Sequence, residues 1–419
     1  MQQALLKLKG PSVTHVDHQH VPPLIKRKVQ RRSVGSSPGK AERAPATRCD
    51  DVHADVVIIG GGIIGLCAAY SLLKQSSTKL KVALIDINDT IPGKPTGNGS
   101  ATGAGQGYIW MSHRDPKSRA WLLAERSKAL WQELFQLRGT LTESSVEWQR
   151  SGSMLLATCA AETEQLCKRQ VMLEAAGITA AVMDAEALRA EEPALGSAVC
   201  AGLLTRTDAQ LNGRLAAAAL LRACKALRDE SNFTLLLEHR VEGFELCRST
   251  GRVLAVQTDK RRVMPCKTLV LAAGAWTGAL AAQAAPASTA AWLPCIQPRR
   301  GHLLELSSGV TPLIQHGLME IGYAQHYASQ TARSNENLDI TFTATTSASG
   351  SLLLGSSREF CGFHGQSSPA VVQAILDRAA MFLPGLREVD LSMVDVRKLE
   401  RSLGASSWGK SKTKNLLEF

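Results

Sequence analysis

The sequence lacks a Cys-x-x-Cys pair, although ten cysteines are spread along the chain between Cys49 and Cys361. Structural zinc sites and the disulfide scaffolds of small secreted proteins need closely spaced cysteines, so this spacing argues against both. We expect no metal site. We expect the thiols to be reduced, mostly buried, and to serve as small hydrophobic side chains.

Acidic residues are scarce at the N-terminus, where the first 49 positions hold ten basic residues against Asp17 and Glu42. This segment carries +8 of the total net charge of +11, so the rest of the chain is nearly neutral. A charge confined to one end gives little support for nucleic-acid binding by the folded part. We therefore expect no nucleic-acid partner.

The same N-terminal segment lacks the apolar stretch of about 7–15 residues that a secretory signal requires. It is basic and interrupted by five prolines. We interpret residues 1–51 as an organelle transit peptide, with the chloroplast favoured and the mitochondrion as the alternative. An unstructured basic tail without a targeting role is the other interpretation.

Long hydrophobic runs are also lacking, apart from the 18 uncharged residues of Val56–Leu73. That length reaches the threshold for a membrane helix. However, the run contains four glycines, with β-branched residues before them and alanine and leucine after them. This order predicts a buried strand, a tight turn and a buried helix, and therefore no membrane span. A chain of 419 residues with 44% hydrophobic residues is expected to form a globular protein of about two domains.

The glycines of this run form a dinucleotide-binding motif. Gly60–Gly65 reads Gly-x-Gly-x-x-Gly and lies between the strand-like Ala54–Ile59 and the helical Leu66–Leu73. A second strand-like segment ends at Asp86, which is 21 residues after Gly65 and where a ribose-binding acid is expected. The alternative is a glycine-rich structural turn. The motif alone does not distinguish FAD from NAD.

A physical requirement explains why glycine stands at each position of the motif. Gly60 allows the tight turn, Gly62 lets a pyrophosphate approach the backbone, and Gly65 lets the helix pack closely on the strand. The N–H groups and the dipole at the start of the helix favour phosphate binding.

Further segments occur in a fixed order along the chain: Asn98–Gly107, Gly152–Ala157, Asp184–Pro193, Thr268–Thr277, Pro298–Leu304 and Gly350–Glu359. With the glycine motif, they give a sequence that from Ala54 to Arg397 resembles the D-amino-acid oxidase-like (DAO) family of FAD-dependent oxidoreductases. This is the group of glycine oxidase and sarcosine oxidase, and the sequence looks most like plant organellar members.

The resemblance implies an α/β fold with a Rossmann-type FAD-binding domain and a mostly antiparallel α+β substrate domain. The FAD-binding domain would be discontinuous, over residues 52–138 and 207–293. The substrate domain would use residues 139–206 and 294–395. Strand-like segments at Asn232–His239, Val253–Gln257 and Val263–Ala272 and a helical segment at Gly213–Leu227 agree with this division. We read Asp115–Leu137 as a scaffold helix that begins with its aspartate as the cap.

The implied cofactor is FAD. Small residues in Asn98–Gly107 would allow the backbone to approach the flavin ring, although a flexible loop is an alternative. Gly274 ends the apolar run Thr268–Ala273 as a strand ends at a cofactor crevice, although an ordinary core strand is an alternative. We expect the following residues to contact FAD: Gly60, Gly62, Ile63, Ile64, Gly65, Asp86, Ser100, Ala101, Gly105, Gln106 and Gly274.

The substrate residues are less clearly indicated. The family usually offers an arginine to a substrate carboxylate, but the strand Asp339–Thr346 carries none. Arg358 is our candidate, because a guanidinium binds a carboxylate through two hydrogen bonds, and a surface salt bridge is the alternative. His302, Tyr323 and Tyr327 are polar groups that either face the flavin or pack in the core.

The C-terminus departs from the family. Residues 398–419 match neither the terminal strand nor the helix that in the family faces the flavin, so the sequence predicts that both elements are absent. Since that helix would stabilise negative charge on the reduced flavin, we expect weak flavin retention and slow turnover.

The resemblance implies an FAD-dependent oxidoreductase that oxidises the C–N bond of a small amine or amino acid. The hydride would pass to flavin N5 from a carbon held about 3–3.5 Å away. Oxygen or another molecule would accept the electrons. Two alternatives stay open: an NAD-dependent dehydrogenase, and a catalytically impaired truncated isoform that at most binds nucleotide or a partner.

Overall fold

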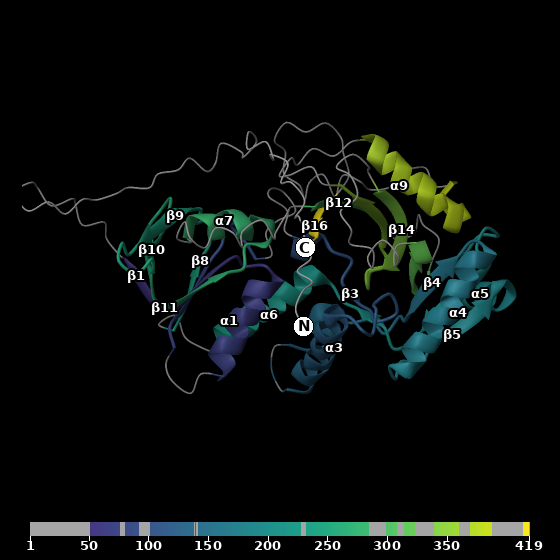
Figure 1. The fold of residues 1–419 in the computed structure, drawn as a ribbon, viewed down its shortest axis with the longest axis horizontal. Helices are drawn as coiled ribbons and strands as arrows, with labels where there is room; N and C mark the ends of the chain where they lie inside the picture. Colours follow the sequence, from purple (N-terminus) through teal and green to yellow (C-terminus); the bar gives the residue numbers. More distant parts are fainter. Residues whose placement is uncertain are drawn as a thin grey trace, which may run out of the picture. The chain divides into compact units, whose positions relative to one another are not determined.

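Figure 1 shows the fold in a computed structural model, which describes residues 51–75, 80–91, 101–137, 139, 141–227, 232–284, 299–307, 314–322, 339–359, 369–387 and 414–418. All of them belong to one compact unit, Arg48–Phe419. The residues of the predicted leader, apart from Asp51, lie outside the described ranges.

A six-stranded sheet contains the glycine motif. Its four strands at one side are parallel, and the last two are antiparallel. In spatial order the strands are β8 (Phe233–Leu236), β2 (Val82–Ile85), β1 (Val52–Ile59), β11 (Arg262–Leu271), β10 (Val253–Thr258) and β9 (Val241–Leu246).

Both faces of this sheet are buried, as expected for parallel strands covered by helices. On β1, Val56 and Ile58 pack with α1 (Ile63–Gln75) and α6 (Gly213–Leu227), which lie side by side in Figure 1. Val57 and Ile59 point to the other face, where α7 (Thr277–Ala284) contributes Leu280. The predicted strand, turn and helix within Val56–Leu73 are therefore confirmed. Within the described residues, no helix combines the length and the apolarity needed to cross a bilayer.

A second, eight-stranded sheet is antiparallel except between β13 and β4. In spatial order its strands are β16 (Lys414–Glu418), β12 (Arg299–Leu306), β15 (Leu352–Arg358), β14 (Asp339–Thr346), β13 (Gly317–Glu320), β4 (Ser153–Ala157), β6 (Ala201–Thr205) and β5 (Ala181–Asp184). The two sheets confirm the mixed α/β fold. The exact domain boundaries stay a prediction.

The eight-stranded sheet also has two covered faces. On β4, Met154 and Leu156 pack on the side of α9 (Pro369–Phe382), which runs along the sheet in Figure 1. Leu155 and Ala157 face the opposite side, where they meet Trp110 and α4 (Ala160–Ala175). This alternation is the period of two that a strand imposes on its side chains.

The remaining short elements are α2 (Ala101–Ala104), the two-stranded ribbon of β3 (Tyr108–Ile109) and β7 (Ala209–Gln210), α5 (Ala185–Glu191), and the 3-10 turns η1 (Ser144–Val146), η2 (Gly274–Trp276) and η4 (Pro384–Arg387).

The scaffold helix begins later than predicted. Helix α3 spans Arg119–Gln136, and its cap is Ser118, whose side chain accepts a hydrogen bond from Trp121 N. Asp115 instead forms a turn, because its side chain accepts from Lys117 N and its carbonyl from Ser118 N. The prediction of Asp115 as the cap was wrong, since aspartate satisfies turns and helix starts equally well.

Two further expectations are corrected. Six described cysteines are free thiols, as expected, but four of these are exposed, so they are not mostly buried. Residues 414–418 form strand β16, which pairs with β12 from Arg299↔Glu418 to Leu303↔Lys414. The prediction that the C-terminal segment offers no strand was wrong, because any extended segment can pair with the open edge of a sheet.

Candidate functional site

The two most specific motifs of the sequence meet at one edge of the six-stranded sheet. Strands β1 and β11 are parallel neighbours, and the turns after them are in contact. Gly60 has a φ of 110°, and a Cβ atom on it would lie 2.3 Å from Ala272 O. Glycine is therefore required at this position by both its conformation and its contact. Gly274, in the turn after β11, also has a positive φ, of 56°.

The other two glycines of the motif have different surroundings. A Cβ on Gly65 would lie 1.9 Å from Gly60 O, which explains the close packing of α1 on the turn. A Cβ on Gly62 would meet only Thr102 Oγ1, at 3.3 Å. The backbone at Gly62 is thus accessible beside the first turn of α1. Ile64, in that turn, is 69% exposed.

Asp86 follows the last residue of β2 at the same edge. Its Oδ2 accepts a hydrogen bond of 2.6 Å from Gly61 N, and its Oδ1 accepts from Asn88 N at 2.8 Å. The carboxylate is therefore held against the glycine turn, at the carboxyl end of the strand beside β1. This is the position from which an acid can bind the ribose of a dinucleotide.

Helix α2 closes this crevice from the side. Thr102 Oγ1 accepts a hydrogen bond of 3.0 Å from Ile63 N, so the predicted contact residues Ala101 and Ile63 lie on adjoining elements. Gly105 follows α2, and its N–H donates to Ala101 O. Ser100 lies outside the described residues. These positions fit a bound dinucleotide, because the glycine turn at Gly60–Gly65, the N-terminus of α1 and Asp86 lie together at one edge of the sheet.

Gln106 links the cofactor crevice to the eight-stranded sheet. Its Oε1 accepts hydrogen bonds from Tyr108 Oη at 2.5 Å and from Thr343 Oγ1 at 3.0 Å, while Nε2 donates to Leu353 O. The side-chain oxygen is thus already engaged by protein groups. Gln106 positions strands β14 and β15 relative to α2, and no pattern in the sequence indicated its partners Tyr108 and Thr343.

Arg358 is buried at the end of β15, with only 2% of its surface exposed. Its NH1 lies 3.8 Å from Asp339 Oδ2, and the two residues are paired across β14 and β15. The alternative of a salt bridge is thus observed, although the guanidinium is buried and not at the surface. Strand β15, the neighbour of β14, thus carries a buried arginine, whereas Asp339–Thr346 has none.

His113 is a buried titratable residue that the sequence analysis did not select. It is buried in the loop after β3, and burial together with the charges of Arg114, Arg169 and Arg358 lowers its pKa to about 3. The loop is fixed from two sides: Asp208 accepts hydrogen bonds from Met111 N and Ser112 N, and Arg169 donates to Ser112 O. A neutral histidine is thus placed in the electrostatic field of the buried Arg358.

His302 is fully buried on β12. Its Nδ1 lies 2.5 Å from Ser357 Oγ, and burial, with a smaller contribution from Arg300, lowers its pKa to about 4. It packs in the core and is neutral at physiological pH. Tyr323 and Tyr327 lie outside the described residues.

The lowered pKa values of His302 and His113 predict acid-sensitive folding. Both groups stay neutral in the folded protein but gain a proton in the unfolded chain below about pH 6.5, so stability falls as the pH drops through that value. We expect His302 alone to cost about 2 kcal/mol between pH 7.5 and pH 5. The measurement is urea unfolding of wild type and His302→Gln at both pH values. A variant with the same pH dependence as wild type would refute this role for His302.

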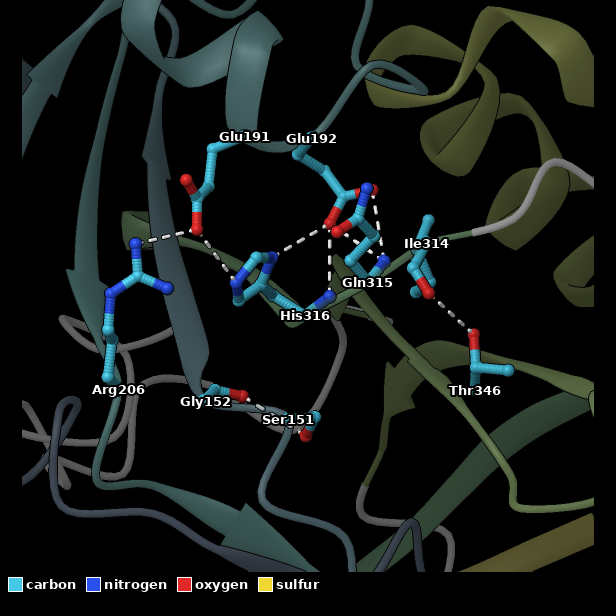
Figure 2. A network of polar contacts seen from close by, with 9 residues as sticks. All are labelled: Ser151, Gly152, Glu191, Glu192, Arg206, Ile314, Gln315, His316 and Thr346. Atoms are coloured by element: carbon cyan, nitrogen blue, oxygen red, sulfur yellow. Dashed lines mark hydrogen bonds and ion pairs between the residues drawn. The ribbon is translucent and has the colours of Figure 1, made fainter.

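The Asp184–Pro193 segment has a structural role. Asp184 caps α5 by accepting from Glu186 N and Ala187 N. Glu192, fully buried, accepts hydrogen bonds from Gln315 N and His316 N and lies 3.1 Å from His316 Nδ1, as Figure 2 shows. The segment thus ties α5 to the start of β13.

Comparisons with known proteins agree with this geometry. A sequence model of the family described as "DAO: FAD dependent oxidoreductase" matches residues 55–410, so the prediction that the resemblance ends at Arg397 was wrong. The hydrogen cyanide synthase subunit HcnC of Pseudomonas aeruginosa is 24% identical over 368 residues, which cover 80% of this chain and 79% of HcnC. The bifunctional protein ThiO/ThiG of Trichormus variabilis is 25% identical over 80% of this chain, which spans only 44% of that protein.

Among solved structures, glycine oxidase from Bacillus cereus superposes with a TM-score of 0.62 at 19% identity, covering 80% of this chain and 79% of the oxidase. That likeness supports the fold. The family match identifies FAD as the cofactor in preference to NAD.

Proposed function

Because the chain belongs to the DAO family of FAD-dependent oxidoreductases, we propose that it oxidises the C–N bond of a small amine or amino acid. The observation that carries this proposal is the convergence of Gly62, Asp86 and Gly274 at one sheet edge, next to a sheet that buries Arg358. One structural neighbour is named glycine oxidase, and glycine is an amino acid.

The residues of the crevice would hold the cofactor as follows. The first turn of α1 and the open backbone at Gly62 would bind the pyrophosphate, and Asp86 would bind the ribose. The backbone of α2 and the turn at Gly274 would lie against the flavin ring. When bound, FAD supplies the acceptor for a hydride from the carbon next to the substrate nitrogen.

The chain's own residues would bind and orient the substrate. Arg358 would pair with the carboxylate of an amino acid. This ion pair would be stronger than one at the surface, because the guanidinium is buried. His113 is neutral, so it adds no charge that competes with this pair and can offer a hydrogen bond. The Gln106 hydrogen bonds to Tyr108 and Thr343 would keep the sheet at a fixed distance from α2.

The direct test uses the purified chain reconstituted with FAD. We expect the fraction of the protein that retains FAD to show the characteristic flavin absorbance, and we expect that absorbance to bleach when a small amino acid or secondary amine is added without oxygen. Absence of flavin reduction across a panel of amino acids and amines, in protein that retains FAD, would contradict the proposed reaction.

Gly62→Ala is expected to weaken FAD binding by roughly 1–3 kcal/mol, about 5- to 150-fold in Kd, because the new methyl group would project toward the pyrophosphate. The fold should be little affected, since the nearest protein atom, Thr102 Oγ1 at 3.3 Å, belongs to a side chain that needs to shift by only a few tenths of an ångström. Flavin fluorescence titration gives the affinity. Gly243→Ala, where a Cβ meets nothing within 4 Å, is the matched control. Equal affinity in both variants would show that the phosphate does not bind at Gly62.

A further inference from the structure

A cavity of about 500 Å³ lies between α3 and the loop that joins β6 to β7. Neither Arg358 nor any residue of the cofactor crevice lines this cavity. Its volume is in the range of sites that hold small organic molecules. Met111, Trp148 and Ile178 give it apolar walls, so a ligand with an apolar body can be accommodated.

Three cationic side chains line this cavity: Lys128, Arg150 and Arg206. Each is held in place by a contact. Lys128 Nζ donates to Thr207 O at 2.6 Å, Arg206 NH2 lies 2.7 Å from Glu191 Oε1, and Arg150 pairs with Glu143. A guanidinium with one N–H engaged keeps others for a second anion. Burial also lowers the pKa of Lys128, so a bound anion would stabilise its ammonium form.

Arg206 has a side chain that is 67% exposed, and its ion pair with Glu191 connects it to buried residues. Figure 2 shows Glu191 between Arg206 and His316, whose Nε2 lies 3.4 Å from Glu191 Oε1. The opposite ring nitrogen of His316 lies 3.1 Å from the fully buried Glu192. This chain of contacts pre-positions the guanidinium that borders the cavity, which reduces the entropy lost on binding.

Acidic residues are also present at the cavity, because Glu143 and Glu191 each pair with one of its two guanidinium groups. Glu125 is the one exposed acid of the lining. Asp208 also lines the cavity, but its oxygens accept hydrogen bonds from Met111 N, Ser112 N and Ser153 Oγ. Burial raises the pKa of Asp208, which weakens its opposition to an anion. The lining itself thus contains three cationic and two acidic side chains beside its apolar residues, and Lys128 is the cation that no glutamate pairs with in the described structure.

We propose that this cavity binds a small organic carboxylate with an apolar body, at a site separate from the catalytic crevice. The apolar part would lie along Trp148 and Ile178, and the carboxylate would bind Lys128 and Arg206. Binding there would stabilise the loop at 206–209 and, through Asp208, the segment that carries His113.

The test is calorimetric titration of the FAD-loaded protein with 2-naphthoate and with its neutral isostere 2-naphthamide. We expect naphthoate to bind at least about tenfold more tightly than the amide, because only the carboxylate can pair with the cations. Lys128→Met and Arg206→Gln should each weaken the binding of naphthoate about twofold to fivefold. Arg126→Gln is the matched control: Arg126 lies on α3, pairs with Glu133 and does not line the cavity.

The flavin spectrum separates this site from the catalytic one. Naphthoate binding at the cavity should leave the flavin absorbance band unchanged and should persist in Arg358→Met. Equal affinity for the amide, equal affinity in Lys128→Met and Arg206→Gln, or binding that shifts the flavin band and is lost in Arg358→Met would each overturn the proposal.

Discussion

Replacing Gly65 by alanine is expected to abolish FAD binding by disrupting the turn that forms the crevice. The added Cβ would lie 1.9 Å from Gly60 O, a backbone atom that cannot move without displacing α1 from β1. Overpacking of this kind costs about 1–3 kcal/mol of stability, and a contact with backbone places Gly65→Ala at the upper end of that range. Thermal unfolding of the apoprotein and flavin retention on gel filtration measure the two effects.

The contrast with Gly62→Ala makes this prediction specific. Both substitutions add one methyl group within the same motif, but only the one at Gly65 meets protein backbone. Gly65→Ala should lower the unfolding temperature of the protein without FAD, whereas Gly62→Ala should not. An unchanged unfolding temperature for Gly65→Ala would show that α1 does not pack closely on the glycine turn.

Replacing Arg358 by methionine is expected to have the largest effect on activity. Removing one partner of a buried charge pair costs about 2–5 kcal/mol of binding free energy. For an amino-acid substrate this corresponds to a decrease of roughly 30- to 5000-fold in kcat/KM. Methionine retains much of the apolar volume of arginine. Asp339, 3.8 Å from the guanidinium, loses its partner but is partly exposed, so it can be solvated.

The readout that identifies a role in substrate binding is a comparison of two substrates. An amino acid should lose efficiency in Arg358→Met, mainly through KM, whereas an amine without a carboxylate should be little affected. Rates of anaerobic flavin reduction for the pair give this ratio. A decrease of the same size for both substrates would mean that Arg358 only stabilises the end of β15.

The glycine motif and its acid were predictable from sequence, because their geometry is local. Gly60 needs a positive φ and Gly65 needs a close approach to Gly60, and both constraints act between residues that are near one another in the chain. Asp86 could be located because the length of one helix and one strand fixes its distance from Gly65. Strand and helix periodicities in Val56–Leu73 likewise follow from consecutive residues.

Only the tertiary structure determined which distant groups meet. Tyr108 and Thr343 bind the same oxygen of Gln106, and the threonine is 237 residues from the glutamine. The register of β14 and β15, rather than any spacing in the sequence, places Asp339 opposite Arg358. The pKa of His113 reflects burial and three arginines from separate segments of the chain. Such contacts depend on strand pairing and burial, and for that reason composition and periodicity identified the cofactor motif but not the residues that position the substrate sheet.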